Sequence, residues 1–131
     1  MNAKAVDFAY YTVSDIETSV SFYQETLGLE LEILDEESGW AEFASPPTTL
    51  ALGEANPHMP ISPGEGGVGL ALAVDDVKAA VDELREEEVT VLMDTVDSGV
   101  CDMAMVGDPD GNPIMLHRRH DGTHGRKNPF P

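Results

Sequence analysis

The chain has few basic residues. Lysine and arginine together number 7 among 131 residues, against 25 aspartates and glutamates, so the formal net charge is −18 at pH 7. Nucleic acids and anionic membrane surfaces attract proteins through clustered cations. We therefore expect neither of them to be a partner.

Cysteine and long apolar runs are scarce as well. The one cysteine, Cys101, excludes a disulfide framework within the chain. It stands in an apolar run, where cysteine is more often a small buried residue than a nucleophile. No run approaches the length of a membrane span, and the first residues do not combine a basic segment with an apolar one. We expect a soluble, cytoplasmic protein.

The acidic residues are scattered along the chain rather than confined to one segment. This pattern is typical of a solvated acidic surface, and the composition is similar to that of proteins from salt-loving organisms. The alternative is that some of these carboxylates line a cavity for a cationic ligand.

One amphipathic helix is predicted within residues 13–28. Ser14 and Glu17 have the spacing of a capping box, and Gly28 supplies a left-handed stop. Apolar residues recur on one helical face at Ile16, Val20, Tyr23 and Leu27.

The same pattern returns 61 positions later, where Asp76 corresponds to Asp15 and a second helix is predicted from Val77 to about Glu87. Each helix follows a strand-like run, at 6–13 and 68–74, and precedes another, at 29–34 and 89–93. Further short strands are predicted at 40–44, 48–53, 100–106 and 113–116. The pattern indicates an α+β protein built from two tandem βαβββ modules.

The chain length suits a single domain containing both modules. We expect module 1 at about 6–54, a linker rich in proline and glycine at about 55–67, module 2 at about 68–117 and a polar tail at 118–131. The tail histidines His120 and His124 lie near His117 in the sequence, but Gly122 and Gly125 disfavour a rigid helix there. We expect no specific metal site in this tail.

Three sequence features together resemble the vicinal oxygen chelate superfamily, which contains glyoxalase I, bleomycin-resistance proteins, fosfomycin-resistance enzymes and extradiol dioxygenases. Val13-Ser14-Asp15 precedes the first helix, and that helix ends with Phe22-Tyr23 and Leu27-Gly28-Leu29. Asp108-Pro109-Asp110-Gly111-Asn112 forms a tight turn before an apolar last strand. The resemblance covers about residues 6–117.

The resemblance implies that each sheet curls into a cup and that paired modules enclose a cavity, within one chain or across a homodimer. It also implies four positions for metal ligands, which correspond here to Phe8, Ala51, Gly69 and Met115. None of these residues suits a hard divalent ion. We therefore expect no metal at those positions and no cofactor.

The inward positions in phase with these four predict the cavity lining: Phe8, Tyr10, Thr12, Ala51, Gly69, Ala71, Met115 and His117, with Trp40, Glu42, Cys101, Asp102 and Met103 of uncertain phase. We expect such a cavity to bind a small apolar or cationic molecule. One alternative is an enzyme of the same superfamily (lyase, isomerase or dioxygenase) that uses Tyr10 or Tyr11 with Glu42, Asp102 or His117 as acid and base. Another is an interaction protein whose cavity is filled by its own side chains.

Overall fold

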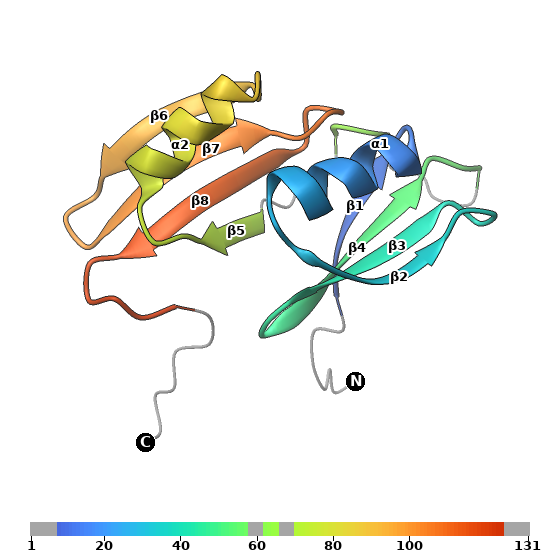
Figure 1. Ribbon diagram of the computed structural model, residues 1–131, viewed down its shortest axis with the longest axis horizontal. Coiled ribbons are helices and arrows are strands. Elements are labelled where there is room, and N and C mark those ends of the chain that lie inside the picture. Colours follow the sequence, from blue (N-terminus) through green and yellow to red (C-terminus); the bar gives the residue numbers. More distant parts are fainter. Residues whose placement is uncertain (1–7, 58–61, 66–69, 125–131) are drawn as a thin grey trace. The chain divides into compact units, whose positions relative to one another are not determined.

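The computed structural model describes residues 8–57, 62–65 and 70–124, and the chain divides into two compact units, residues 1–66 and 67–131 (Figure 1). The first unit consists of β1 (Phe8–Val13), α1 (Ile16–Ser21), the π-helical turn η1 (Phe22–Thr26), β2 (Glu30–Asp35), β3 (Trp40–Ser45) and β4 (Thr48–Glu54). The second consists of β5 (Leu70–Ala73), α2 (Val77–Glu86), β6 (Val91–Asp97), β7 (Cys101–Gly107) and β8 (Pro113–Arg119). Two βαβββ modules are thus confirmed.

Both modules have the same sheet topology. The strand order is β1-β4-β3-β2 in the first sheet and β5-β8-β7-β6 in the second. In each sheet the first strand is parallel to the last strand of its module, whereas the other pairs are antiparallel. The sheets are therefore mixed, as the α+β prediction requires.

Each helix begins at an aspartate. Asp15 accepts a hydrogen bond from the Thr18 amide at 3.2 Å, and Asp76 accepts one from the Ala79 amide at 2.9 Å. The prediction of Ser14 as the cap was wrong by one residue, because the capping residue is the last extended residue before the helix, and this residue is Asp15. The predicted glycine stop is confirmed, since Gly28 has a φ of 75°.

Two strands of the second module differ most from their predicted bounds. β6 begins at Val91 rather than Val89, because the Val89 amide still donates to Leu84 of the preceding helix and Glu88 adopts a φ of 63°. β8 continues to Arg119, past the predicted end at Leu116, because it pairs with β7 as far as Cys101.

Each helix covers one face of its own sheet. In the first module Ile16, Val20 and Tyr23 are buried with strand residues of the helix-facing side, and the rings of Tyr23 and Phe43 lie 5.8 Å apart. On the helix-facing side the buried strand residues are Tyr11, Val13, Ala41, Phe43, Leu50 and Leu52, and on the opposite side Thr12 and Ala51 are buried as well. In the second module the helix residues Val77, Val81 and Leu84 are buried with the strand residues Ala104, Val106, Ile114 and Leu116. The opposite face, which we call the open face, carries the alternate residues.

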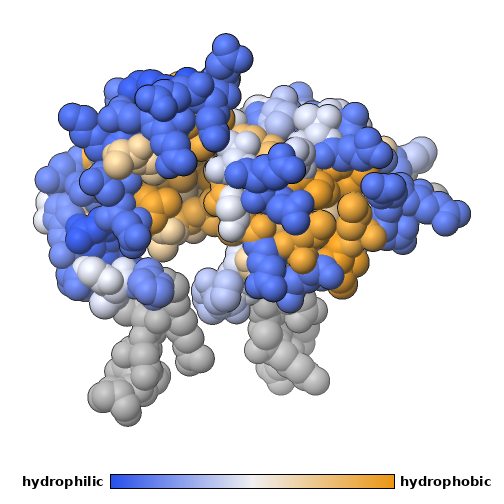
Figure 2. Space-filling view, viewed as in Figure 1, coloured by the Kyte–Doolittle hydropathy of each residue, from blue (hydrophilic) through white to orange (hydrophobic). Residues whose placement is uncertain are grey.

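Some large apolar side chains remain exposed on the strands at the sheet edges. They are Ile33 and Leu34 on β2 and Leu92 and Val96 on β6. Figure 2 shows hydrophilic residues over α2 and hydrophobic residues gathered over the β2–β3 part of the first module. Within the described segments, no helix combines the length and the apolar character needed to cross a membrane.

Candidate functional site

The open face of the first sheet brings together four of the eight predicted site residues. Phe8, Tyr10 and Thr12 alternate along β1, and the ladder places Tyr10 beside Ala51 of β4. Ala51 in turn pairs with Glu42 of β3. The four predicted residues therefore share one face, and Glu42, whose phase was uncertain in the sequence, joins them.

Three aromatic rings lie against one another on this face. The Trp40 ring stacks on Tyr10 at a centroid distance of 5.8 Å and an interplanar angle of 22°. It also meets Phe8 edge to face at 5.8 Å and 83°. We call Phe8, Tyr10 and Trp40 the aromatic cluster. Phe8 is 44% exposed, so the cluster presents apolar ring surface to solvent.

A glycine makes room for this arrangement. A Cβ atom at Gly53 would lie 2.7 Å from the Tyr10 hydroxyl and 2.9 Å from the Tyr10 Cε2 atom, well inside van der Waals contact. Gly53 pairs with both Thr12 and Trp40 across the sheet. The Tyr10 ring therefore lies over the backbone of β4 at a place where any side chain would displace it.

Polar groups border the aromatic cluster. The Trp40 indole N–H donates to Glu42 Oε2 at 2.9 Å. The Thr12 hydroxyl donates to the Tyr10 hydroxyl at 3.2 Å, and the Tyr10 hydroxyl donates weakly to the Gly53 carbonyl at 3.5 Å. The face thus combines stacked rings with one carboxylate, which suits a flat ligand that is apolar or positively charged.

The open face of the second sheet is rich in methionine. One row across the strands reads Ala71, Met115, Met105 and Met93, and the next reads Ala73, His117, Met103 and Val96. The face thus carries four of the six methionines of the chain. Their thioethers are polarizable and adapt to ligands of different shapes. The predicted site residues Ala71, Met115 and His117 lie here, whereas Gly69 lies outside the described residues.

A surface cleft of about 490 Å³ lies near the end of β8. It is lined by Gly99, Val100, Cys101, His117, Arg119, His120 and Asp121. Within the second module it combines the predicted His117 and Cys101, whose phase was uncertain in the sequence, with Val100 of the predicted strand 100–106 and with residues outside the predicted strands.

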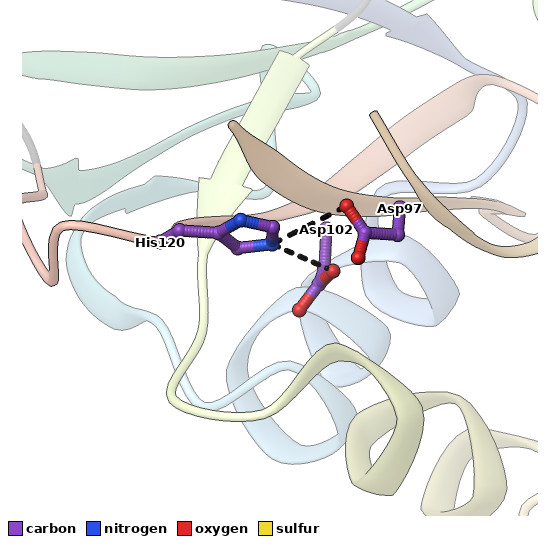
Figure 3. A group of neighbouring side chains, drawn as sticks. All are labelled: Asp97, Asp102 and His120. Carbon is purple, nitrogen blue, oxygen red and sulfur yellow. Dashed lines mark hydrogen bonds and ion pairs between the residues drawn. The ribbon is translucent and has the colours of Figure 1, made fainter. Parts of the chain in front are cut away.

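Beside this cleft, three side chains of metal-binding types, two aspartates and one histidine, meet at the β6–β7 turn (Figure 3). His120 Nε2 lies 3.0 Å from Asp102 Oδ1 and 3.6 Å from Asp97 Oδ1. The hydrogen bond to Asp102, together with the negative charges of Asp97 and Asp102, raises the pKa of His120 above 6.5, although desolvation opposes this shift. We call Asp97, Asp102 and His120 the acidic histidine cluster.

The position of His120 corrects the expectation that the polar tail begins at residue 118. The His120 amide donates to the Val100 carbonyl at 2.9 Å, which ties it to the β6–β7 turn. Sequence reasoning missed this because the partner of His120 lies 20 residues earlier in the chain. The other tail histidine in the described residues, His124, is exposed.

Two groups named for an alternative enzymatic role lie away from the open faces. Tyr11 is 2% exposed and belongs to the helix-facing side of β1. Asp102 is engaged with His120 at the β6–β7 turn. Tyr10 and Glu42 are the acid and base candidates that share one face, on either side of Ala51.

Comparison with known proteins identifies a matching family and similar solved structures. Residues 5–116 match the model of the Glyoxalase/Bleomycin resistance protein/Dioxygenase superfamily. The structure is similar to that of TnmS3, an antibiotic binding protein from Streptomyces sp. CB03234, with 33% identity, a TM-score of 0.73, and 91% of this chain and 98% of that chain covered.

Two further solved structures show the same similarity. A glyoxalase/bleomycin resistance protein from Streptomyces sp. CB03234 is 33% identical, with a TM-score of 0.69 and coverage of 87% of this chain and 100% of that one. A superfamily member from Sphaerobacter thermophilus DSM 20745 is 29% identical, with a TM-score of 0.71 and coverage of 88% and 97%.

Proposed function

Because the chain belongs to the glyoxalase/bleomycin resistance protein/dioxygenase superfamily, we propose that it binds a flat small molecule, apolar or cationic, on the open faces of its sheets. We further propose that it does so without a metal at the positions that family members use, which correspond to Phe8, Ala51, Gly69 and Met115. The side chains of Phe8 and Ala51 are hydrocarbon, and Met115 offers a soft thioether.

The aromatic cluster is the observation that carries this proposal. Exposed ring surface held in a fixed stack is ready to receive another flat ring, and each aromatic pair contributes roughly 0.5–1.5 kcal/mol beyond the burial of its area. Trp40 is oriented by its hydrogen bond to Glu42, so little conformational freedom is lost when a ligand stacks on it.

Charge favours a cation among flat ligands. Glu42 places a carboxylate at the edge of the aromatic cluster, and a cation near an aromatic face gains about 0.5–2 kcal/mol. The net charge of −18 adds a long-range attraction for cations. The methionine-rich open face of the second module offers a further apolar, adaptable surface.

The relatives support binding as the activity. TnmS3 is described as an antibiotic binding protein, and it covers nearly the whole of this chain at 33% identity. A natural product with fused rings is the class of ligand that the aromatic cluster would accept.

The test uses three flat tricyclic probes that differ in charge: proflavine, phenazine and phenazine-1-carboxylate. Trp40 is the only tryptophan in the chain, so quenching of its fluorescence reports on the aromatic cluster directly. We expect affinity to fall in the order cation, neutral molecule, anion, and isothermal titration calorimetry checks the values independently of fluorescence.

Two variants locate the site. Tyr10→Ala removes the stacking partner of Trp40 and should weaken all three probes, by about tenfold if ~1.4 kcal/mol of stacking is lost. Glu42→Gln should weaken the binding of proflavine and leave the binding of phenazine unchanged. The matched control Glu36→Gln, on the exposed turn after β2, should change neither affinity. Equal binding of proflavine by the native protein, Tyr10→Ala and Glu42→Gln would show that this face is not the site.

The enzymatic alternative rests on Tyr10 and Glu42, which share the open face of the first sheet. An enzyme would use them as acid and base, whereas a binding protein would release its ligand unaltered. Mass spectrometry of a bound ligand after prolonged incubation separates the two, because a chemically changed ligand whose conversion is lost in Glu42→Gln identifies an enzyme.

We also propose that the chain forms a homodimer. The exposed apolar residues on β2 and β6 support this, because strands at sheet edges with apolar side chains are surfaces on which chains associate. Light scattering after gel filtration should give twice the 14.1 kDa of one chain, and Ile33→Lys should lower that mass.

A further inference from the structure

We infer that Asp97, Asp102 and His120 form a binding site for a divalent transition-metal ion such as Zn²⁺, with coordination positions left open toward the neighbouring cleft. None of the four positions implied by the family resemblance takes part. The inference is therefore independent of the small-molecule site on the open face of the first sheet.

The spacing of the donor atoms fits coordination. Zinc binds imidazole nitrogen and carboxylate oxygen at about 2.0–2.2 Å, so two such donors on one ion lie about 3.0–3.5 Å apart. In the acidic histidine cluster the two nitrogen-to-oxygen distances are 3.0 Å and 3.6 Å. All three donor atoms lie within 4.8 Å of one another.

Charge balance favours a divalent ion over a proton. Asp97 and Asp102 face each other directly in the β6–β7 ladder, and like charges at opposed positions destabilise a strand pair. A protonated His120 brings one positive charge to two carboxylates, which leaves a net charge of −1. A neutral His120 together with a divalent ion gives the same cluster a net charge of zero.

Backbone hydrogen bonds restrain two of these three residues before any ion arrives. The Gly99 amide donates to Asp97 Oδ1 at 2.7 Å, and the His120 amide is tied to Val100 at 2.9 Å. Three strands or turns of the second module therefore contribute to one point in space: the end of β6, the start of β7 and the residue after β8. Figure 3 shows the imidazole directed at both carboxylates.

The acidic histidine cluster adjoins the cleft through one shared residue, while Asp97 and Asp102 lie outside the cleft lining. His120 belongs both to the acidic histidine cluster and to the lining of the 490 Å³ cleft. Three protein donors with an open fourth position are characteristic of zinc sites that receive water or a second ligand, whereas structural sites have four protein donors. A molecule in the cleft would thus lie next to the open position.

The donor set selects among metals. One imidazole with two carboxylates suits Zn²⁺, Mn²⁺ or Co²⁺, whereas Mg²⁺ and Ca²⁺ prefer oxygen donors alone. We therefore expect Zn²⁺ binding to persist in the presence of excess Mg²⁺.

Calorimetric titration of ZnCl₂ into the untagged full chain, previously stripped with EDTA, tests the inference. We expect one saturable site. Asp97→Asn and His120→Gln should each weaken it by at least about tenfold, since even indirect partners of metal ligands contribute 10–100-fold to affinity. Asp94→Asn on the same strand and His124→Gln in the following segment are matched controls, and both should retain native affinity.

Several outcomes would overturn the inference. No saturable binding would mean that the cluster is an ion pair only. Native affinity in His120→Gln, or a loss in His124→Gln as large as in His120→Gln, would place the bound zinc elsewhere. The visible spectrum of the Co²⁺-loaded protein gives a second readout, because removal of the imidazole must change its bands. Proflavine titration of the zinc-free protein keeps this test separate from that of the aromatic cluster.

Discussion

Replacing Gly53 by alanine tests how the aromatic cluster is built. The new methyl carbon would lie 2.7 Å from the Tyr10 hydroxyl, 2.9 Å from Cε2 and 3.2 Å from Cζ. Carbon atoms in favourable contact are about 3.5–4.0 Å apart, so the Tyr10 ring must move by roughly 1 Å or more. That movement breaks the stack with Trp40 and the hydrogen bond from Thr12.

The energetic consequences follow from these contacts. Overpacking of this kind lowers the free energy of unfolding by about 1–3 kcal/mol. A lost stack and a lost hydrogen bond each contribute about 0.5–1.5 kcal/mol to that range. Because the ring is also a surface on which a ligand would stack, we expect the affinity for proflavine to fall by about tenfold, which corresponds to ~1.4 kcal/mol.

Urea denaturation followed by Trp40 fluorescence measures the stability change, and near-ultraviolet circular dichroism reports the altered ring packing. Gly107→Ala is the matched control, since its methyl group would meet neighbours only at ordinary distances of 3.8–3.9 Å. It should change stability little.

A double-mutant cycle gives the result that would refute the reasoning. In a Tyr10→Ala background the Gly53→Ala methyl group no longer meets the tyrosine ring, so most of its cost should disappear and the coupling energy should reach about 1 kcal/mol or more. An equal cost in both backgrounds would show that the Gly53 methyl group clashes with something other than Tyr10.

Two further predictions concern the second module. Asp76→Ala removes the oxygen that accepts a hydrogen bond from the Ala79 amide, so it should lower the free energy of unfolding by about 1 kcal/mol. The control Asp75→Ala should lower it much less. Equal losses of stability in urea denaturation would contradict the capping role of Asp76. In the metal-free protein the hydrogen bond to Asp102 raises the pKa of His120 above 6.5, so its contribution to stability should be complete below pH 6.5 and disappear as the pH rises through the raised pKa. NMR titration of the imidazole checks this, and a pKa at or below 6.5 would contradict it.

Local signals in the sequence were sufficient to predict the two βαβββ modules. Asp15 and Asp76 recur at the same point in each repeat, and both cap a helix. The alternation in β3, where Ala41 and Phe43 are buried, also contains the information that Trp40 and Glu42 point the other way. That signal is short and was not decisive, because a strand of six residues allows either phase until its partners are known.

The remaining site residues depend on register and long-range pairing. Met93 was missed because β6 has irregular register on both sides of it, so alternation along the sequence does not reveal which side chains share a face. Met105 was missed because it shares the phase of Met103, which the sequence left uncertain. His120 was missed because a backbone hydrogen bond to Val100 fixes it, and no local pattern encodes that contact. The homodimer, the enclosed cavity and the absence of metal at the family positions stay predictions.

The parallel pairing of the first and last strands of each module has a consequence for biosynthesis. As the chain leaves the ribosome, β1 has no partner within its sheet until Thr48–Glu54 has been made, because β4 is the strand beside it. The same holds for β5, which must wait for β8. Completion of each sheet therefore closes a loop of some forty residues. The entropic cost of this closure is modest, and it arises once in each module. The nascent chain is thus expected to acquire its structure in two successive steps, one at the end of each module.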